Sequence, residues 1–210
     1  ENLILTNSCT SAITLALKLC GVGHNSSVVS TPMTCVATNT PIVNMGAKII
    51  WSDVDPKSGM MDPNDLRQKI QPDTKAVIAV AWAGTPPHLF ALRKVCDEAN
   101  VPLILDAAHA FGSSYKDKKI GNVGDLTCFS FYVTKNLVTG EGGMVTTNNQ
   151  KLAEFVELYA LHGLSRGAWK RYSDEGFKHY LVQVPGYKYN MMDLQAAIGI
   201  HQFNSFEKNQ

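Results

Sequence analysis

The sequence predicts an α/β domain with a mostly parallel sheet sandwiched by helices. Apolar runs of strand length alternate with helical patterns through the first 106 residues. These runs are apolar at nearly every position, as in strands that are buried on both faces. The 210 residues, of which 45% are hydrophobic and 18% charged, are enough for a globular domain with a proper core.

The first elements alternate as this fold class requires. Residues 3–6, "LILT", form an apolar strand, and residues 10–20 carry apolar side chains on a helical period that ends at Gly21. The next strand is "SVVS" at 27–30, and a helical pattern at 35–46 follows it. These four segments predict two successive strand–helix units.

The same alternation continues to residue 106. The pattern predicts strands at 47–55, 75–82 and 101–106 and helices at 63–70 and 89–100. Asp62 is a suitable N-cap for the first of these helices, and Pro63 suits its first turn. Repeated strand–helix units of this kind favour parallel pairing.

The second half of the chain has shorter and closer elements. Strands are predicted at 126–133 and 142–148, and helices near 150–161 and 192–206. Between 165 and 185 the chain is polar and irregular, and we interpret this segment as an excursion or a lid loop.

Charge and hydropathy exclude several classes of protein. The net charge is +1, so nothing indicates a surface for nucleic acid or for an anionic membrane. No apolar run approaches the roughly 20 residues that a membrane helix needs. We therefore expect no nucleic-acid partner and no membrane partner.

The cysteines and histidines indicate neither a metal site nor a disulfide framework. There are five cysteines and no CxxC pair, and the six histidines show no metal-ligand spacing. This usage is typical of a reducing compartment, so we expect a cytoplasmic protein. The cysteines are Cys9, Cys20, Cys35, Cys96 and Cys128.

Both ends of the chain suggest a piece of a longer protein. The sequence starts with Glu1, directly in a strand-like run, and it stops at "FEKNQ" just after a predicted helix. We treat both ends as artificial.

Candidate site residues lie where predicted strands end. In an open parallel sheet, ligands bind beyond the carboxyl ends of the strands. "TNSCTSA" places Ser8, Cys9 and Thr10 between a strand and a helix, where free backbone N–H groups bind phosphate well. A plain N-cap by Ser8 or Thr10 explains the same residues.

Two further strand ends carry ionisable groups. Asp106 closes a buried strand in "ILDAAHAFG", and a buried carboxylate is costly unless it meets a cation or hydrogen-bond donors. Asp106 could instead cap a helix, and His109 could be a core histidine. Lys135 follows the apolar run "CFSFYV" and precedes the glycines of "TGEGG", although most lysines are solvated surface charges.

Together these three segments fit pyridoxal phosphate. Its phosphate needs N–H donors, its pyridine nitrogen needs a carboxylate, and its aldehyde needs an amine for a Schiff base. Competing motifs are missing: the sequence has no GxGxxG after a strand, no P-loop and no GxSxG elbow.

The motifs give the chain a family resemblance. It resembles the DegT/DnrJ/StrS family of pyridoxal-phosphate sugar aminotransferases through "NSCTSA", "STPMTCVATNTPIVNMGAK", "DVDP", "LILDAAHAFGSSYKDKKIG", "GDLTCFSFYVTKNLVTGEGGMVTTNN", "LHG" and "PGYKYNMMDLQAAIG". The resemblance implies that residues 1–210 are the cofactor-binding large domain of the aspartate-aminotransferase fold type I. It also implies that a preceding segment and a small C-terminal domain are missing here.

The resemblance assigns roles to the catalytic candidates. Lys135 looks like the lysine that forms the Schiff base with the cofactor. Asp106 would pair with the pyridine nitrogen, and His109 would lie near the phenolic oxygen of the ring. A branch of the family that performs dehydration has histidine in place of the lysine, so Lys135 favours transamination.

Further positions are assigned to cofactor binding. Ser130 and the backbone of Cys9 and Thr10 would hold the phosphate. Lys188, in "PGYKYN", matches a position that reaches across a homodimer to the partner's cofactor phosphate, where many relatives have asparagine. Cys35 occupies a place where many relatives stack an aromatic ring on the cofactor, so we expect weaker stacking.

The implied reaction moves an amino group from an amino acid, usually glutamate in this family, to a nucleotide-linked keto sugar. It would serve amino-sugar and polysaccharide biosynthesis, and the enzyme would be a homodimer. A pyridoxal-phosphate sugar dehydratase, a cysteine desulfurase and a cofactor-binding regulatory protein without turnover stay open as alternatives. No mobile cysteine loop, which a desulfurase would need, is evident.

Overall fold

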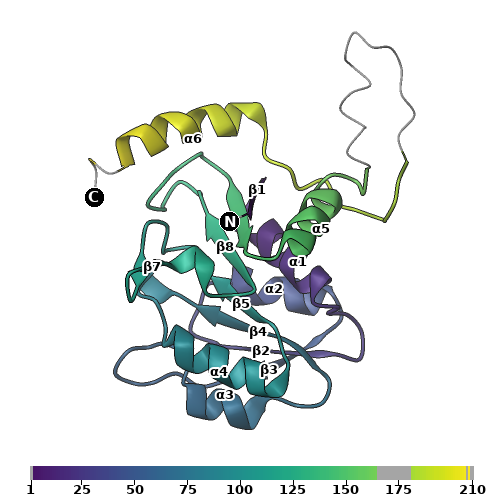
Figure 1. Cartoon of the computed structure of the whole chain (residues 1–210), viewed down its shortest axis with the longest axis vertical. Coiled ribbons are helices and arrows are strands. Elements are labelled where there is room, and N and C mark those ends of the chain that lie inside the picture. The colour runs from purple at the N-terminus through teal and green to yellow at the C-terminus, as the bar shows by residue number, and fades with distance from the viewer. Residues whose placement is uncertain (1, 165–180, 207, 209–210) are drawn as a thin grey trace.

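A seven-stranded sheet organises the computed structural model, which describes residues 2–164, 181–206 and 208 (Figure 1). The strand order is β1-β9-β8-β5-β4-β2-β3. The strands are β1 (Asn2–Thr6), β2 (Ser27–Ser30), β3 (Lys48–Trp51), β4 (Thr74–Val80), β5 (Leu103–Asp106), β8 (Leu126–Ser130) and β9 (Gly143–Thr147). The predicted α/β fold class is confirmed.

The sheet is mostly parallel, as predicted, with one reversed strand. β3, β2, β4, β5 and β8 pair in parallel. β9 runs antiparallel to both of its neighbours, β8 and β1. β9 is antiparallel to β8 because the loop 131–142 returns the chain at the same end of the sheet at which β8 ends.

The two faces of the sheet are both buried. Ala76 and Ile78 of β4 belong to one hydrophobic cluster, and the alternating residues Val77 and Ala79 belong to the other. Side chains on a strand alternate between the faces, so a strand buried on both faces must be apolar at every position. This burial explains the continuous apolar runs of the sequence.

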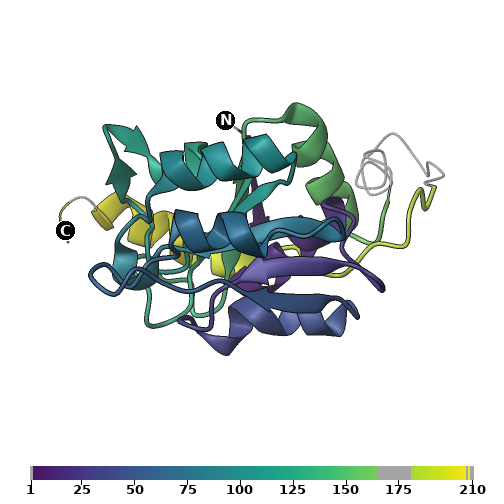
Figure 2. The ribbon, with the colours of Figure 1, turned by 90° about the horizontal axis from the view of Figure 1, so that it is seen from below.

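Helices cover both faces (Figure 2). On one face pack α1 (Cys9–Leu19), α2 (Val36–Asn44) and α5 (Gln150–Ala160), and on the other α3 (Pro63–Lys69) and α4 (Leu89–Ala99). The last helix is α6 (Asp193–Phe206). Two short 3₁₀ helices, η1 (Trp82–Gly84) and η2 (Ile120–Asn122), connect elements of the sheet.

Side-chain caps define several helix starts. The Asn64 N–H donates to Asp62 Oδ1 over 2.8 Å at the start of α3, which confirms the cap expected from the sequence. Asn149 Oδ1 accepts from two N–H groups at the start of α5. These bonds satisfy donors that the first turn of a helix cannot pair internally.

Two predicted strands end three or more residues earlier than expected. β3 stops at Trp51 rather than 55, and β8 stops at Ser130 rather than 133. After β8, the Phe131 N–H donates to Gly142 O over 2.9 Å, and Phe131 O accepts from the Thr139 N–H over 2.8 Å. These bonds close residues 131–142 into a loop of their own. Lys135 therefore lies on a loop beyond the sheet, not at the end of a strand.

A small hairpin was not predicted from the sequence. It consists of β6 (Ser114–Tyr115) and β7 (Lys118–Lys119), which pair antiparallel. Lys116 and Asp117 turn the chain with φ values of 48° and 63°. Positive φ at both central residues is the geometry of a type I′ turn, which usually calls for Asn-Gly, so Lys-Asp gave no signal.

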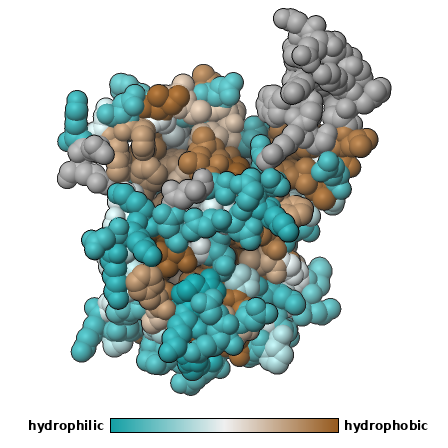
Figure 3. Space-filling model, viewed as in Figure 1, coloured by the Kyte–Doolittle hydropathy of each residue, from teal (hydrophilic) through white to brown (hydrophobic). Residues whose placement is uncertain are grey.

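The outer surface is partly apolar near the end of the chain. Figure 3 shows apolar surface in the upper part of the molecule, where α6 lies, and the α6 side chains Leu194, Ile198, Ile200 and Phe203 are exposed. Within the described ranges, no helix is both long and apolar enough to cross a membrane.

Most of the predicted loop at 165–185, residues 165–180, lies outside the described residues.

Candidate active site

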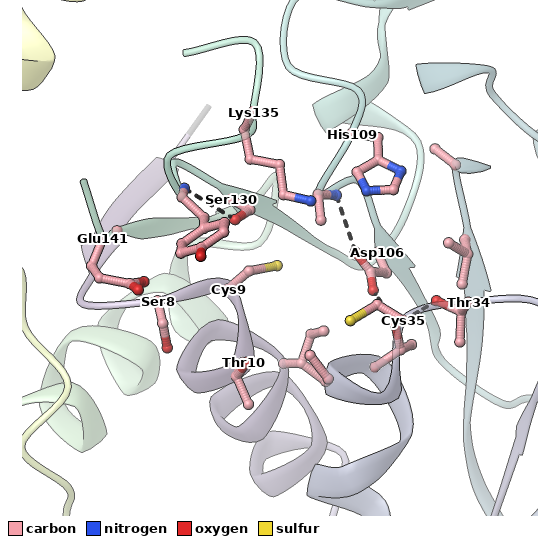
Figure 4. Close-up of a pocket in the computed structure, with 18 residues that line it drawn as sticks. Ser8, Cys9, Thr10, Thr34, Cys35, Asp106, His109, Ser130, Lys135 and Glu141 are labelled. Atoms are coloured by element: carbon pink, nitrogen blue, oxygen red, sulfur yellow. Dashed lines mark hydrogen bonds between the residues drawn. The ribbon is translucent and has the colours of Figure 1, made fainter. Parts of the chain in front are cut away.

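One pocket gathers almost all of the predicted site residues (Figure 4). It opens beyond the carboxyl ends of β4, β5 and β8, beside the starts of α1 and α2. Its lining includes Cys9, Thr10, Cys35, Asp106, His109, Ser130 and Lys135. Lys188 does not line it: its side chain is exposed, and its Nζ donates to Asn190 Oδ1 over 2.6 Å.

Asp106 is the buried anion of this pocket. Only 4% of its surface is exposed, at the end of the central strand β5. Thr38 Oγ1 donates to Asp106 Oδ2 over 2.6 Å, and the Ala108 N–H donates to Oδ1 over 3.0 Å. No salt bridge among the described residues involves this carboxyl group. The site therefore presents a carboxylate that is oriented by two donors and has no cation bonded to it.

Burial controls the protonation of Asp106 and of His109. Burial raises the pKa of Asp106, while the bonds from Thr38 and Ala108 and the nearby charges of His109 and Lys135 act in the opposite direction. Burial also lowers the pKa of His109, and the ammonium of Lys135 lowers it further, against the attraction of Asp106. A cation at Asp106 would favour the ionised carboxylate.

His109 is held by the short helix η1. The Ala83 N–H donates to His109 Nδ1 over 3.3 Å, and the Trp82 and His109 rings lie 5.6 Å apart at 59°. An imidazole with a lowered pKa that accepts at Nδ1 carries its proton on Nε2. His109 can therefore donate a hydrogen bond from Nε2.

The start of α1 forms a cradle for an anion. Ser8 Oγ accepts from the Ser11 N–H over 3.1 Å, so the predicted cap is present. Among the described residues, the N–H groups of Cys9 and Thr10 have no acceptor. The capping and phosphate-binding interpretations are thus compatible, because the cap uses one donor and leaves two.

Gly143 packs directly against the backbone at the start of α1. A Cβ on Gly143 would lie 2.4 Å from the carbonyl carbon of Ser8 and 2.6 Å from the nitrogen of Cys9. Only a residue without a side chain lets β9 approach the start of α1 so closely. The glycine therefore has a packing role, in addition to following a turn.

The two pocket cysteines differ. Cys9 is buried, and burial raises the pKa of its thiol well above its ordinary value, an effect that Asp106 reinforces. Cys9 thus contributes its backbone N–H rather than a thiolate. Cys35 is exposed at the rim of the pocket and caps α2 without a side-chain hydrogen bond, so it offers a small polarisable contact where an aromatic ring could stack.

Among the lining residues that the sequence analysis missed, three have polar side chains that could contact a ligand. Thr38, Tyr132 and Glu141 all line the pocket, from α2 and from the 131–142 loop. Thr38 carried a weak signal, because it lies one helical turn after Thr34, to which its hydroxyl is bonded over 2.7 Å. Glu141 lies between glycines and carried no signal of its own.

The residues present fit pyridoxal phosphate. Asp106 offers an anion without a bonded cation, the start of α1 offers two free N–H donors, and Gly143 keeps that start open. Lys135 offers a primary amine in the same pocket. The chemistry of the donor set thus matches the charged and reactive groups of this cofactor.

A family model decides the classification. The model of the DegT/DnrJ/EryC1/StrS aminotransferase family matches residues 1–210. The chain belongs to this family. The resemblance read from the motifs is therefore confirmed, and with it the pyridoxal-phosphate fold type.

Individual relatives agree with this membership. The chain is 46% identical over 204 residues, 97% of its length, to the uncharacterized protein MJ1066 of Methanocaldococcus jannaschii, of which this covers 53%. It is 42% identical over 210 residues, 100% of its length, to the spore coat polysaccharide biosynthesis protein SpsC of Bacillus subtilis, of which this covers 54%. The chain thus spans about half the length of these relatives.

Solved structures support the cofactor class. The PLP-form of the putative sugar aminotransferase Spr1654 from Streptococcus pneumoniae matches with a TM-score of 0.88 and 29% identity, covering 98% of this chain and 55% of that one. The PMP-form of the same protein matches with a TM-score of 0.89. The cofactor expected from the sequence is confirmed for the family.

Among the described residues, no group of His, Cys, Asp or Glu is arranged to hold a metal ion.

Replacing Gly143 should damage the cradle. We expect Gly143→Ala to push the start of α1 away, at a cost of about 1–3 kcal/mol in stability, which is typical of overpacking. The dissociation constant of pyridoxal phosphate, measured by fluorescence titration, should rise about tenfold or more, since 1.4 kcal/mol corresponds to tenfold. Gly23→Ala is the matched control, because its Cβ would meet nothing within 4 Å. Equal cofactor affinity in the two variants would contradict this role.

Replacing Asp106 should separate stability from function. Burial raises the pKa of Asp106 above its ordinary value of 3.8, so the cofactor-free fold loses stability as the pH rises from that value through the folded-state pKa. Asp106→Asn removes this loss. Between pH 3.8 and the folded-state pKa of Asp106, the melting temperature of the variant should exceed that of the wild type by an amount that grows with pH. Above that range the difference should stay constant. The cofactor affinity of the variant should fall.

Thermal unfolding of the cofactor-free proteins between roughly pH 3 and 8 measures this difference. Asp117→Asn, on the exposed hairpin turn, is the matched surface control. An Asp106→Asn variant that melts below the wild type at neutral pH would contradict the argument.

Proposed function

We propose that the protein is a pyridoxal-phosphate-dependent aminotransferase that moves an amino group from an amino acid to a nucleotide-linked keto sugar. The observation that carries the proposal is that Lys135 and Asp106 line one pocket with the free N–H groups of α1. Membership in an aminotransferase family supports the same reaction type.

Each pocket residue has a definite task in this reaction. The N–H groups of Cys9 and Thr10, with Ser130 Oγ, would hold the phosphate group. Asp106 would keep the proton on the pyridine nitrogen, and His109 Nε2–H would donate to the phenolic oxygen. The bound cofactor supplies an electron sink for the electron pair that remains on a substrate carbon when its proton leaves.

Lys135 would have two tasks. Its Nζ would bind the cofactor covalently at rest, and once released it would move the proton to and from the substrate carbon as a general base and acid. A position on the 131–142 loop suits this double use, because the side chain must swing between the two tasks. Phe131, buried and bonded on both sides, anchors that loop to the sheet.

The relatives support a sugar as the amino acceptor. SpsC is named for spore coat polysaccharide biosynthesis, and Spr1654 is described as a putative sugar aminotransferase. We extend these descriptions to a nucleotide-linked keto sugar, with glutamate as the amino donor. Lys135 supports transamination over the dehydratase alternative, and measured amine transfer would separate it from a regulatory protein without turnover.

The proposal includes the surroundings of the site. We propose that residues 1–210 are the cofactor-binding large domain of a longer protein, in keeping with the half-length coverage of the relatives. We also propose a homodimer in which Lys188 reaches the partner's site, since its ammonium is exposed outside its own pocket. The five free cysteines support a reducing compartment such as the cytoplasm.

Lys135→Ala tests the reaction type. The purified holoenzyme should show the visible absorbance band of covalently bound cofactor, and the variant should lose that band together with nearly all amine transfer, by about 10²–10⁴-fold or more. Lys94→Ala, on the exposed side of α4, should keep both. An unchanged spectrum in Lys135→Ala would remove the proposed function.

Mixed dimers test the role of Lys188. We expect Lys188→Ala and Lys135→Ala homodimers to be nearly inactive. If Lys188 serves the partner's site, a heterodimer has one fully native site and one doubly altered site. With random mixing, half of the dimers are mixed and one of their two sites works, so about a quarter of the wild-type activity should return. If Lys188 served its own site, mixing would restore nothing.

A further inference from the structure

A second carboxylate faces the pocket and has no task in the scheme above. Glu141 lines the pocket beside Ser8, on the opposite side of the pocket from Asp106 (Figure 4). Its side chain is exposed, and among the described residues its carboxylate has neither an ion pair nor a hydrogen-bond donor. A solvated surface glutamate would also lack partners. The contacts of the Glu141 backbone therefore decide whether the residue is held in a fixed position.

The backbone of Glu141 is fixed from two sides. Its carbonyl oxygen accepts from Thr139 Oγ1 over 2.7 Å and from Gln195 Nε2 over 2.7 Å. Gln195 is 8% exposed at the start of α6, and its Oε1 accepts from the Met192 N–H over 2.9 Å. The Gln195 side chain is buried and both ends of its amide are hydrogen-bonded, so it restricts the movement of the Glu141 backbone.

The glycines on either side of Glu141 fix its direction. Gly140 has a φ of +80°, which L side chains rarely adopt. A Cβ on Gly142 would lie 2.3 Å from Thr139 Oγ1 and 2.9 Å from Met191 Cε, so Gly142 packs directly against these residues. With both neighbours restricted, the loop presents the Glu141 side chain toward the mouth of the pocket.

We propose that Glu141 is a specificity-determining residue that binds hydroxyl groups of the amino acceptor. This inference rests on the proposed function, because it assigns the acceptor's place in that site. An ionised carboxylate only accepts hydrogen bonds, and its two oxygens suit the O–H donors of a sugar. The same charge repels the carboxylates of an amino-acid donor.

Glu141 would thus distinguish the two substrates that share one pocket. The donor carries carboxylate groups near its reacting carbon, and the acceptor carries hydroxyl groups there. A site that binds both in turn gains from a group that favours the second without tightening the first. The phosphate of the cofactor, which is also an anion, is no partner for this carboxylate.

Steady-state kinetics of the holoenzyme test the inference. In a reaction with two half-reactions, kcat/KM for each substrate reports the half-reaction of that substrate. The probes are glutamate and a panel of UDP- and dTDP-linked 4-keto-6-deoxy sugars. The variant is Glu141→Gln, which keeps the shape and removes the charge, and the control is Asp117→Asn.

We expect Glu141→Gln to lower kcat/KM for the best keto sugar about tenfold, mainly through KM, as for a hydrogen bond to a charged group. The value for glutamate should stay within twofold or rise. The dissociation constant of pyridoxal phosphate should stay within twofold, and Asp117→Asn should change none of these values.

Other outcomes would overturn the inference. A sugar kcat/KM within twofold of the wild type would show that Glu141 does not touch the acceptor. A parallel fall for both substrates with a changed cofactor affinity would show that its charge serves the cofactor, for example through Lys188 of the partner subunit. If the wild type transferred no amine to any sugar but did use other acceptors, both this inference and the proposed acceptor would fall.

Discussion

A carboxylate that is almost fully buried is costly without a compensating positive charge, and Asp106 has none bonded to it among the described residues. Its oxygens are instead held by the Thr38 hydroxyl and the Ala108 N–H, which orient the group without neutralising it. Such a group destabilises the cofactor-free fold, and it would stabilise a bound ligand that carries a protonated ring nitrogen. The central position of β5 makes this charge immobile, and the other site residues are arranged around it.

The opposite end of the site is built by close backbone contact. Gly143 lets β9 press against the start of α1, where two N–H groups remain available. Between these rigid ends lies the 131–142 loop with Lys135 and Glu141, which is tied to the start of α6 through Gln195. The proposed contacts to the ring and to the phosphate thus come from β5 and the start of α1, whereas Lys135 and Glu141, proposed to act on the substrates, lie on an anchored loop.

Much of the fold was predictable because its causes are local. Strands buried on both faces need apolar residues at every position, and α3 carries its own cap in Asp62. The ends of β3 and β8 were wrong by a few residues, and after β8 the apolar run continues past the last ladder bond through Phe131, Tyr132 and Val133. The hairpin at 114–119 was missed, because Lys-Asp is an unusual pair for its turn.

The sequence by itself determined the family, the cofactor class and the candidate residues Lys135, Asp106 and His109, because several motifs in a fixed order are specific. Only the tertiary structure decided which neighbours serve them. Thr38 reaches Asp106 across 68 positions of sequence, and Gln195 reaches Glu141 across 54. Contacts between such distant positions arise from the packing of elements, and no local pattern of residues encodes them.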